Sequence, residues 1–269
     1  MRNGKDVEGS ARGMAENGDD RDFVNSLARG LEVIRSFTRA RPRMTLSEVA
    51  AETDLPRAAV RRFLLTLVRE GYAATDGKLF QLRPKVLELG YSVIASLSIV
   101  EVAQPVMADV SARLNESCSV AVLDGDEIVY VARSSAKRVV NIAATIGGRL
   151  PAYVTSMGRV LLAALDDAAL DVYLARISPE KLNARTVTSR VKLRDAILEA
   201  RHKGWSLVDQ ELEPGLCSIA VPLKDRTGRT VAALAIGAPS GRVDAATMRE
   251  RFLPVLQEAA QQMALAMPD

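Results

Sequence analysis

The stretch TLSEVAAETDLPRAAVRRFLLTLVREG, residues 45–71, decides the fold of the N-terminal part of this chain. Thr45 followed by Glu48 is a capping box, in which each side chain satisfies a free backbone N–H at the start of a helix. Pro56 suits the first turn of a second helix, because a proline there loses no helical hydrogen bond. Gly71 is placed to end that helix as a C′ glycine. Two helices joined by a short turn are therefore expected.

A hairpin follows the second helix directly. Residues 72–75 and 78–82 are short segments rich in apolar residues, and they flank Asp76-Gly77, a strong short-range hairpin signal. Each of these features is common when it occurs alone. The ordered set of helix, turn, helix and hairpin is much more specific, and it is typical of a winged helix-turn-helix, whose second helix enters a DNA groove.

The distribution of charge supports a DNA-binding module. Residues 21–90 contain 13 Lys and Arg against 8 Asp and Glu, whereas residues 91–269 contain 20 of each kind. Basic side chains that neutralise phosphates supply most sequence-independent affinity for DNA. The candidate DNA contacts lie on the two helices, in the wing and in the loop 41–43 before the module: Thr45, Ser47, Arg57, Ala58, Arg61, Arg62, Lys78, Arg41 and Arg43.

The remaining composition bounds the class of protein. A chain of 269 residues with 48% apolar residues fits two modest domains better than one. No apolar run is long enough to span a bilayer, and residues 1–21 are polar and lack the apolar core of a signal peptide, so a disordered tail is expected there. Cys118 and Cys217 make no disulfide framework, which favours a reducing cytoplasm.

Patterning along the chain predicts an α+β organisation. A first helix is expected from about 25 to 39, capped by Asn25 or Ser26, with Leu27, Leu31, Ile34 and Phe37 inside. We divide the rest into a winged helix-turn-helix domain (22–83), a linker helix (84–98) and a C-terminal domain (99–269). In that last domain strands are expected near 119–123, 128–133, 139–144, 206–210, 217–223 and 231–237, with a loop at 147–151. Helices are expected near 99–115, 156–165, 167–176, 193–203 and 245–267, so a largely antiparallel sheet with helices is predicted.

Residues suited to catalysis are scarce. The single histidine, His202, sits at an expected helix end, and it cannot form a zinc site with two isolated cysteines. No phosphate-binding loop pattern occurs, so no cofactor and no metal are expected. Asp209, Glu211 and Glu213 could be an acidic cluster of an enzyme, but at alternating strand positions they suit solvent or the rim of a pocket better. Redox sensing by the two cysteines is a further alternative, disfavoured because buried cysteines mostly behave as small apolar residues.

Two longer motifs carry a resemblance to a known family. The winged module, the linker helix, TSMGRVLLA at 155–163 and EPGLCSIAVP at 213–222 together resemble the IclR family of bacterial transcription regulators, over roughly residues 22–267. Shorter segments at 26–34, 62–68, 87–91 and 151–153 resemble its branch that controls aromatic-acid and β-ketoadipate catabolism.

The resemblance implies a non-enzymatic regulator that binds a roughly palindromic double-stranded operator as a homodimer or tetramer. It also implies a GAF-like C-terminal domain that binds a small organic acid. Members that bind small keto acids carry serines on the strand matching 234–238, whereas this chain has Ala235 and Gly237 there, which leaves room for a larger ligand.

The expected effector site is built around the start of the helix at 156. Free N–H groups at Met157 and Gly158, with the Ser156 hydroxyl, would bind a carboxylate, and Tyr153 would cover an aromatic ring. The alternative is that Ser156 only caps the helix and that the arginines are solvated. The complete set of candidates also includes basic, acidic and strand residues: Arg149, Arg133, Asp209, and Cys217 with Ile219 as one wall.

Overall fold

The computed structural model describes residues 23–90, 99–134 and 145–266. The chain divides into two compact units, residues 1–91 and 92–269, which are described separately. The expected N-terminal tail, the expected strand at 139–144 and residues 91–98 of the expected linker lie outside the described residues. Of that linker, the structure describes a 3₁₀ turn, η1 (Pro84–Leu87), followed by helical residues 88–90.

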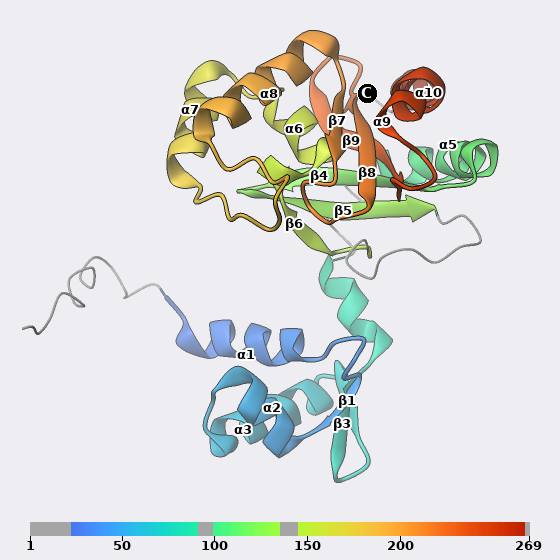
Figure 1. The fold of residues 1–269 in the computed structure, drawn as a ribbon. Helices are drawn as coiled ribbons and strands as arrows, with labels where there is room; N and C mark the ends of the chain where they lie inside the picture. The colour runs from blue at the N-terminus through green and yellow to red at the C-terminus, as the bar shows by residue number, and fades with distance from the viewer. Residues whose placement is uncertain (1–22, 91–98, 135–144, 267–269) are drawn as a thin grey trace, which may run out of the picture. The chain divides into compact units, whose positions relative to one another are not determined.

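The N-terminal unit has the expected order of helices and hairpin (Figure 1). Its elements are α1 (Asn25–Ser36), β1 (Arg43–Thr45), α2 (Leu46–Thr53), α3 (Arg57–Arg69), β2 (Ala73–Thr75) and β3 (Leu79–Leu82). The prediction that residues 41–43 form a loop is wrong at Arg43, which begins β1. Strand β1 pairs antiparallel with β3, so the sheet has the order β1-β3-β2. A buried cluster that includes Val33, Val49, Val60 and Leu64 holds the helices together.

The start of α2 and the end of α3 are fixed by interactions between neighbouring residues, as predicted. The Thr45 hydroxyl accepts from the Glu48 N–H at 3.3 Å, and the Glu48 carboxylate accepts from the Thr45 N–H at 2.7 Å, so the capping box is confirmed. Gly71 has φ +82°, and the Tyr72 N–H donates to the Leu67 carbonyl at 2.8 Å. This is the Schellman arrangement, which needs a left-handed residue at the end of the helix.

The apolar face of α1 differs from the prediction. The helix ends at Ser36, and its N-cap position is Val24, with no side-chain cap from Asn25 or Ser26. Leu27 and Leu31 are 63% and 46% exposed rather than buried. Val33 and Ser36 face the core instead, so α1 presents a second apolar stripe that no described residue covers.

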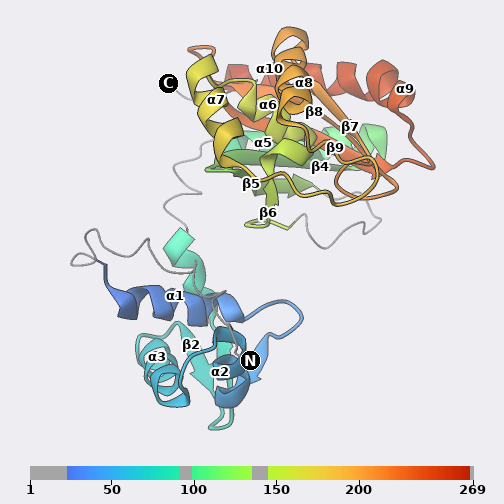
Figure 2. The ribbon, with the colours of Figure 1, turned by 60° about the vertical axis from the view of Figure 1, so that its left-hand side comes forward.

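The C-terminal unit is an antiparallel sheet with helices on both faces (Figures 1 and 2). Its described strands have the order β6-β5-β4-β9-β8-β7: β4 (Ser117–Asp124), β5 (Glu127–Ser134), β6 (Arg149–Pro151), β7 (Ser206–Asp209), β8 (Leu216–Lys224) and β9 (Thr230–Pro239). Its helical elements are α5 (Ile99–Leu114), η2 (Ala152–Val154), α6 (Ser156–Leu162), α7 (Asp167–Arg176), α8 (Arg190–Lys203), α9 (Ala245–Thr247), a π-helical turn (Met248–Phe252) and α10 (Leu253–Ala266).

Two apolar cores lie on opposite faces of this sheet. Helices α5 and α10 pack against large side chains of the central strands, among them Leu234 and Ile236. Helices α6, α7 and α8 cover the other face, where Ala220, Ala233 and Ala235 point at α6. Small side chains on that face allow α6 to approach the sheet closely. Toward the end of the sheet they leave unfilled space.

The segment before α6 was predicted as a loop and is partly strand. Residues Arg149–Pro151 form β6, which pairs with Glu127–Val129 at the edge of the sheet. Hydrogen bonding across the sheet, rather than any local propensity, sets this conformation.

Candidate functional site

The basic end of α3 is free of internal ion pairs. Arg57, Arg61 and Arg62 are exposed, and no acidic side chain among the described residues lies within ion-pair distance of them. Arg61 lies one turn after Arg57, so the two point to one side of the helix. Exposed Ala58 leaves space between them. Unpaired guanidinium groups at a helix N-terminus suit contacts with phosphates or base edges.

The other candidate DNA contacts have partners or lie nearby. Lys78 and Ser47 are exposed. Arg41 pairs with Glu52, and Arg43 pairs with Asp76 in the wing turn at 2.7 Å.

Exposed pairs of this kind are weak, so both arginines remain available to phosphates. The Thr45 hydroxyl is already engaged in the capping box.

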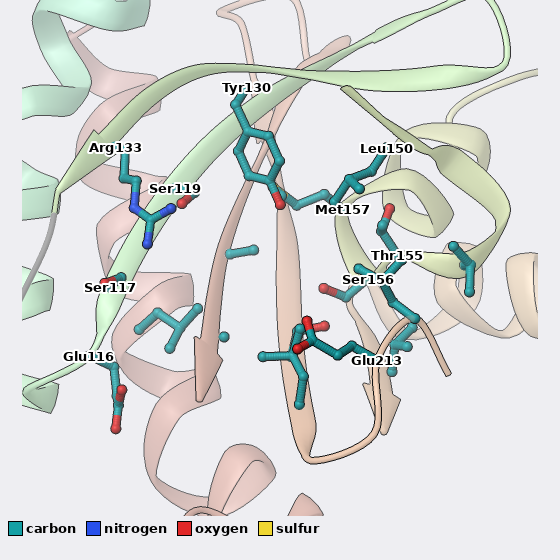
Figure 3. A pocket seen from close by; sticks show the side chains of 18 residues that line it. Glu116, Ser117, Ser119, Tyr130, Arg133, Leu150, Thr155, Ser156, Met157 and Glu213 are labelled. Atoms are coloured by element: carbon teal, nitrogen blue, oxygen red, sulfur yellow. The ribbon is translucent and has the colours of Figure 1, made fainter. Parts of the chain in front are cut away.

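The C-terminal unit contains a cavity of about 300 Å³ on the α6 side of the sheet. Strands β4, β5, β8 and β9 form its floor, while the start of α6 and the β7–β8 connection form its walls (Figure 3). Its lining residues are Glu116, Ser117, Ser119, Tyr130, Arg133, Leu150, Val154, Thr155, Ser156, Met157, Val208, Leu212, Glu213, Leu216, Ser218, Ala235, Ile236 and Gly237. The small residues on β8 and β9 create its volume.

Polar groups gather at two sides of this cavity. Figure 3 shows Arg133, Ser117, Ser119 and Glu116 on one side, and Ser156 and Glu213 on the other. The Glu116 carboxylate pairs with Arg242. Arg133 and Ser119 lie opposite one another on paired strands. The cavity can therefore bind an anion at one side and a hydroxyl at the other.

The middle of the cavity is largely apolar. Met157 and Leu150 lie there, with the Tyr130 ring between the two polar sides (Figure 3). Burial raises the pKa of Tyr130, and the nearby charge of Arg133 opposes that shift. The phenol is therefore neutral and can donate a hydrogen bond to a ligand.

Three of the predicted effector residues line the cavity: Arg133, Ser156 and Met157. Thr155, rather than Ser156, caps α6, because its hydroxyl accepts from the Gly158 N–H at 3.0 Å. The Ser156 hydroxyl is thus not needed for the cap. The Gly158 N–H is already bonded, so Gly158 does not supply the predicted anion donor.

Gly158 has a different role. A Cβ at this position would lie 2.0 Å from the Ala152 carbonyl oxygen. Only glycine permits η2 and α6 to approach this closely.

Three other predicted effector residues lie away from the cavity. Arg149 is paired with Asp124 at 2.8 Å and Glu127 at 2.7 Å at the exposed edge of the sheet. These carboxylates raise the pKa of Arg149 further. The Tyr153 hydroxyl donates to the Glu180 carbonyl and accepts from the Glu180 N–H.

Asp209 is the third. Its carboxylate pairs with the exposed Arg185 at 2.7 Å. We therefore leave Arg149, Tyr153 and Asp209 out of the proposed site.

The predicted wall of Cys217 and Ile219 is on the wrong face of β8. Both side chains are buried in the core beneath α5 and α10. Leu216 and Ser218, one residue out of register, face the cavity. Alternate residues of β8 do share a face, but the sequence alone does not show which face of a doubly covered strand borders the cavity.

Sequence reasoning missed several lining residues. Ser119 and Tyr130 were placed on predicted strands, and Ser117 just before one, but none was assigned to a site. The sequence did contain one indication, because Ser117 and Ser119 occupy alternate positions in a single, otherwise largely apolar strand. Polar residues with this spacing on a buried strand indicate a polar cavity.

The cysteines do not resemble a reactive pair. Burial raises the pKa of Cys118 to about 12 and that of Cys217 to about 11, with nearby Asp209 adding to the second shift. Reactive cysteines have lowered pKa values, so both thiols stay protonated and inert.

Among the described residues no cluster of His, Cys, Asp and Glu could hold a metal ion. Within the same residues, no helix is both long and apolar enough to cross a membrane.

A DNA-binding winged module joined to a domain with a small polar-ended cavity defines a ligand-responsive transcription regulator. The model for the IclR helix-turn-helix domain matches residues 26–77, and that for the bacterial transcriptional regulator IclR C-terminal domain matches residues 91–265. The chain therefore belongs to the IclR family of transcription regulators, and it is not an enzyme.

Individual relatives agree. The chain is 44% identical to a Pca regulon regulatory protein of Pseudomonas putida, over 91% of this chain and 84% of that protein. A transcriptional regulator of Rhodococcus sp. RHA1 has 50% identity and a TM-score of 0.81, with 90% of this chain and 98% of that chain covered. An IclR homolog of Microbacterium hydrocarbonoxydans, solved with 4-hydroxybenzoate, has 27% identity and a TM-score of 0.79, with 89% and 98% covered.

Proposed function

We propose that this regulator responds to a small hydroxylated aromatic acid, or to an acid formed when such a ring is cleaved, bound in the cavity of the C-terminal unit. The observation that carries the proposal is the polarity of the cavity. One side has an arginine, two serines and a carboxylate, Glu116, that is already paired with Arg242. The other side has a serine and a carboxylate, and the walls between are apolar. A volume of about 300 Å³ lies at the lower end of the usual range for small-molecule sites, ~300–1,000 Å³, so it suits a single ring.

The arrangement orients the ligand. The ligand carboxylate lies toward Arg133, whose five guanidinium donors allow a further acceptor beside its existing partner. A ring hydroxyl then lies toward Ser156 and donates to Glu213. The IclR homolog solved with 4-hydroxybenzoate supports this class of ligand, because that molecule has a carboxylate and a hydroxyl at opposite ends of one ring.

Calorimetric titration tests the proposal, with 4-hydroxybenzoate, 3,4-dihydroxybenzoate, benzoate and β-ketoadipate as probes. We expect Arg133→Met to weaken binding of the best probe at least tenfold and Ser156→Ala to discriminate less well against benzoate. Arg229→Met, which removes a largely exposed arginine of the same unit, is the matched control. Wild-type affinity in both cavity variants would place the ligand elsewhere.

The DNA-binding surface of the proposed regulator is the N-terminal end of α3 with the wing. Arg57, Arg61 and Arg62 would contact base edges or phosphates in the major groove, and Lys78 would contact a phosphate. A gel-shift titration on the promoter of the regulator's own or a neighbouring operon tests this. Failure to shift any such fragment at low salt would reject the assignment.

Exposed apolar side chains of the N-terminal unit support assembly into a dimer. Val24 at the N-cap of α1 and Leu27 and Leu31 within it recur at helical spacing. Leu87 and Leu89 of the linker are 75% and 53% exposed. A stripe of this width is normally covered. A dimer would place two copies of α3 in successive major grooves of a palindromic operator. Because a bacterial operator lies in the cytoplasm, we propose that the regulator acts there.

Light scattering at micromolar concentration tests the assembly. We expect a dimer or tetramer, and we expect Leu27→Lys with Leu31→Lys to weaken it. Val172→Lys is the matched control, because Val172 is equally exposed at 62% but lies on α7 in the other unit. A monomeric wild-type protein would contradict the proposal.

A further inference from the structure

The most deeply buried ion pair in the described part of the chain lies next to the cavity without lining it. Arg159 of α6 and Glu211, which follows β7, are joined by two parallel hydrogen bonds, Nη1–Oε1 at 2.8 Å and Nη2–Oε2 at 2.7 Å. Their side chains are 5% and 11% exposed. Neither residue is among those that line the cavity.

Each partner also binds backbone that belongs to another segment. The Arg159 Nε–H donates to the Tyr153 carbonyl at 3.0 Å, so the guanidinium spans from α6 back to η2. The Glu211 carboxylate accepts from the Val187 N–H at 3.1 Å. The Glu211 carbonyl accepts from the side chains of Asn183 and Thr186 at 2.9 and 2.7 Å. The pair therefore joins three segments that are distant in sequence.

Two of these segments are walls of the cavity. Thr155, Ser156 and Met157 lie between Tyr153 and Arg159, and all three line the cavity. Leu212 and Glu213 follow Glu211 directly and line the same side of the cavity from a second, adjoining wall (Figure 3). Because a bidentate arginine–carboxylate pair is planar, it sets both the separation and the relative orientation of the groups that carry it.

We propose that Arg159 and Glu211 are positioning residues for effector binding, which hold the Ser156 wall and the Glu213 wall at the separation that the ligand requires. This inference rests on the proposed ligand site. It concerns geometry rather than stability, because well-packed apolar residues of similar volume often replace a buried ion pair with no loss of stability, whereas removal of one partner leaves a buried charge uncompensated.

That contrast supplies the test. Single variants such as Glu211→Gln leave the Arg159 charge unpaired and are expected to destabilise the unit, so they are uninformative about positioning. The double variant Arg159→Met/Glu211→Leu removes both charges and keeps the volume. We expect its unfolding temperature to fall less than that of either single variant, because it leaves no unpaired charge and only the Tyr153 carbonyl and the Val187 N–H lose a partner. We expect its affinity for the best aromatic-acid probe to fall at least tenfold and effector-free DNA binding to stay unchanged.

Hydrogen–deuterium exchange gives a second readout that needs no ligand. We expect faster amide exchange at residues 153–158 and 211–215 in the double variant, with exchange in β8 and β9 unchanged. The control is Arg194→Met/Asp171→Leu, which removes an exposed pair at 3.0 Å between α8 and α7 and should change neither exchange at the walls nor binding.

The outcomes separate the two proposals. If the wild type binds a probe and the double variant binds it equally well, the pair is merely structural and the positioning role is overturned. If the wild type binds none of the aromatic or ring-cleavage acids, the proposed ligand class fails, and unchanged exchange at both walls then overturns the positioning role independently. Faster exchange at the walls with retained stability supports it. If the double variant instead unfolds the whole unit, Arg159→Lys replaces it in the test. Lysine keeps the ion pair with Glu211 but cannot form two parallel hydrogen bonds. Wild-type affinity in Arg159→Lys would overturn the proposal.

Discussion

Gly158→Ala is the substitution for which the structure predicts the clearest effect. The new Cβ would lie 2.0 Å from the Ala152 carbonyl oxygen and 2.4 and 2.5 Å from its Cα and carbonyl carbon. Ordinary contact begins at 3.4 Å, so η2 and α6 would have to separate by roughly 1.4 Å. All three atoms belong to buried backbone, which has no rotamer with which to move aside.

The magnitude follows from two opposing effects. An alanine inside a helix is favoured over glycine by ~1 kcal/mol. Overpacking of a core costs ~1–3 kcal/mol or more, and a clash with backbone belongs at the upper end of that range. We therefore expect a net loss of about 2 kcal/mol in the free energy of unfolding. In a domain of this size, each kcal/mol of lost stability lowers the unfolding temperature by ~2–4 °C. We therefore expect the unfolding temperature to fall by about 4–8 °C.

Fluorescence of Trp205 is a suitable measurement, because Trp205 is the only tryptophan of the chain and reports on the C-terminal unit alone. Gly241→Ala is the control, since nothing lies within 4 Å of a Cβ there and Gly241 does not have a positive φ. It should stay within ~0.5 kcal/mol of the wild type, as exposed substitutions usually do. A Gly158→Ala protein that unfolds at the same temperature as Gly241→Ala would refute the reasoning about close approach.

Three further predictions concern the DNA-binding helix, the thiols and the helix cap. Arg61→Ala should weaken specific operator binding by ~1–3 kcal/mol if it reads a base, whereas Arg69→Ala at the far end of α3 should have a smaller effect; an equal loss on random DNA would assign Arg61 to a phosphate. Cys118 and Cys217 should resist iodoacetamide at pH 8 in the folded protein. Their folded pKa values, about 12 and 11, lie above the ordinary value of 9.0, so their contribution to stability is present below pH 9 and is lost as the pH rises through the folded values. Chemical denaturation between pH 8 and 10.5 measures this decrease of the unfolding free energy with pH. Thr45→Ala should cost ~1 kcal/mol through loss of the cap and accelerate amide exchange in residues 46–53, and unchanged exchange would show that the capping box contributes nothing.

Local structure was largely predictable from the sequence, because short-range interactions produce it. The Thr45–Glu48 box, the left-handed Gly71 and the Asp76-Gly77 turn each act within a few residues, and the structure contains all three helix and turn signals where they were expected. The sequence indicated a cap at Ser156, one residue from the observed cap at Thr155.

The faces of elements were predicted less well, because burial depends on what packs from elsewhere. Leu27 and Leu31 have the spacing of a core face, yet Val33 faces the helical core and they do not. Both faces of β8 are covered, so the alternation of Cys217 and Ile219 could not indicate which face borders the cavity.

The amino-acid sequence by itself determined the winged module, its excess of positive charge and the antiparallel organisation of the C-terminal unit. Only the tertiary structure decided which polar side chains share the cavity. Arg133 is brought beside Ser119 by the register of β4 and β5. Arg159 reaches Glu211 across 52 residues of sequence. Contacts between segments so far apart depend on the packing of the whole sheet and its helices, and no local pattern encodes them.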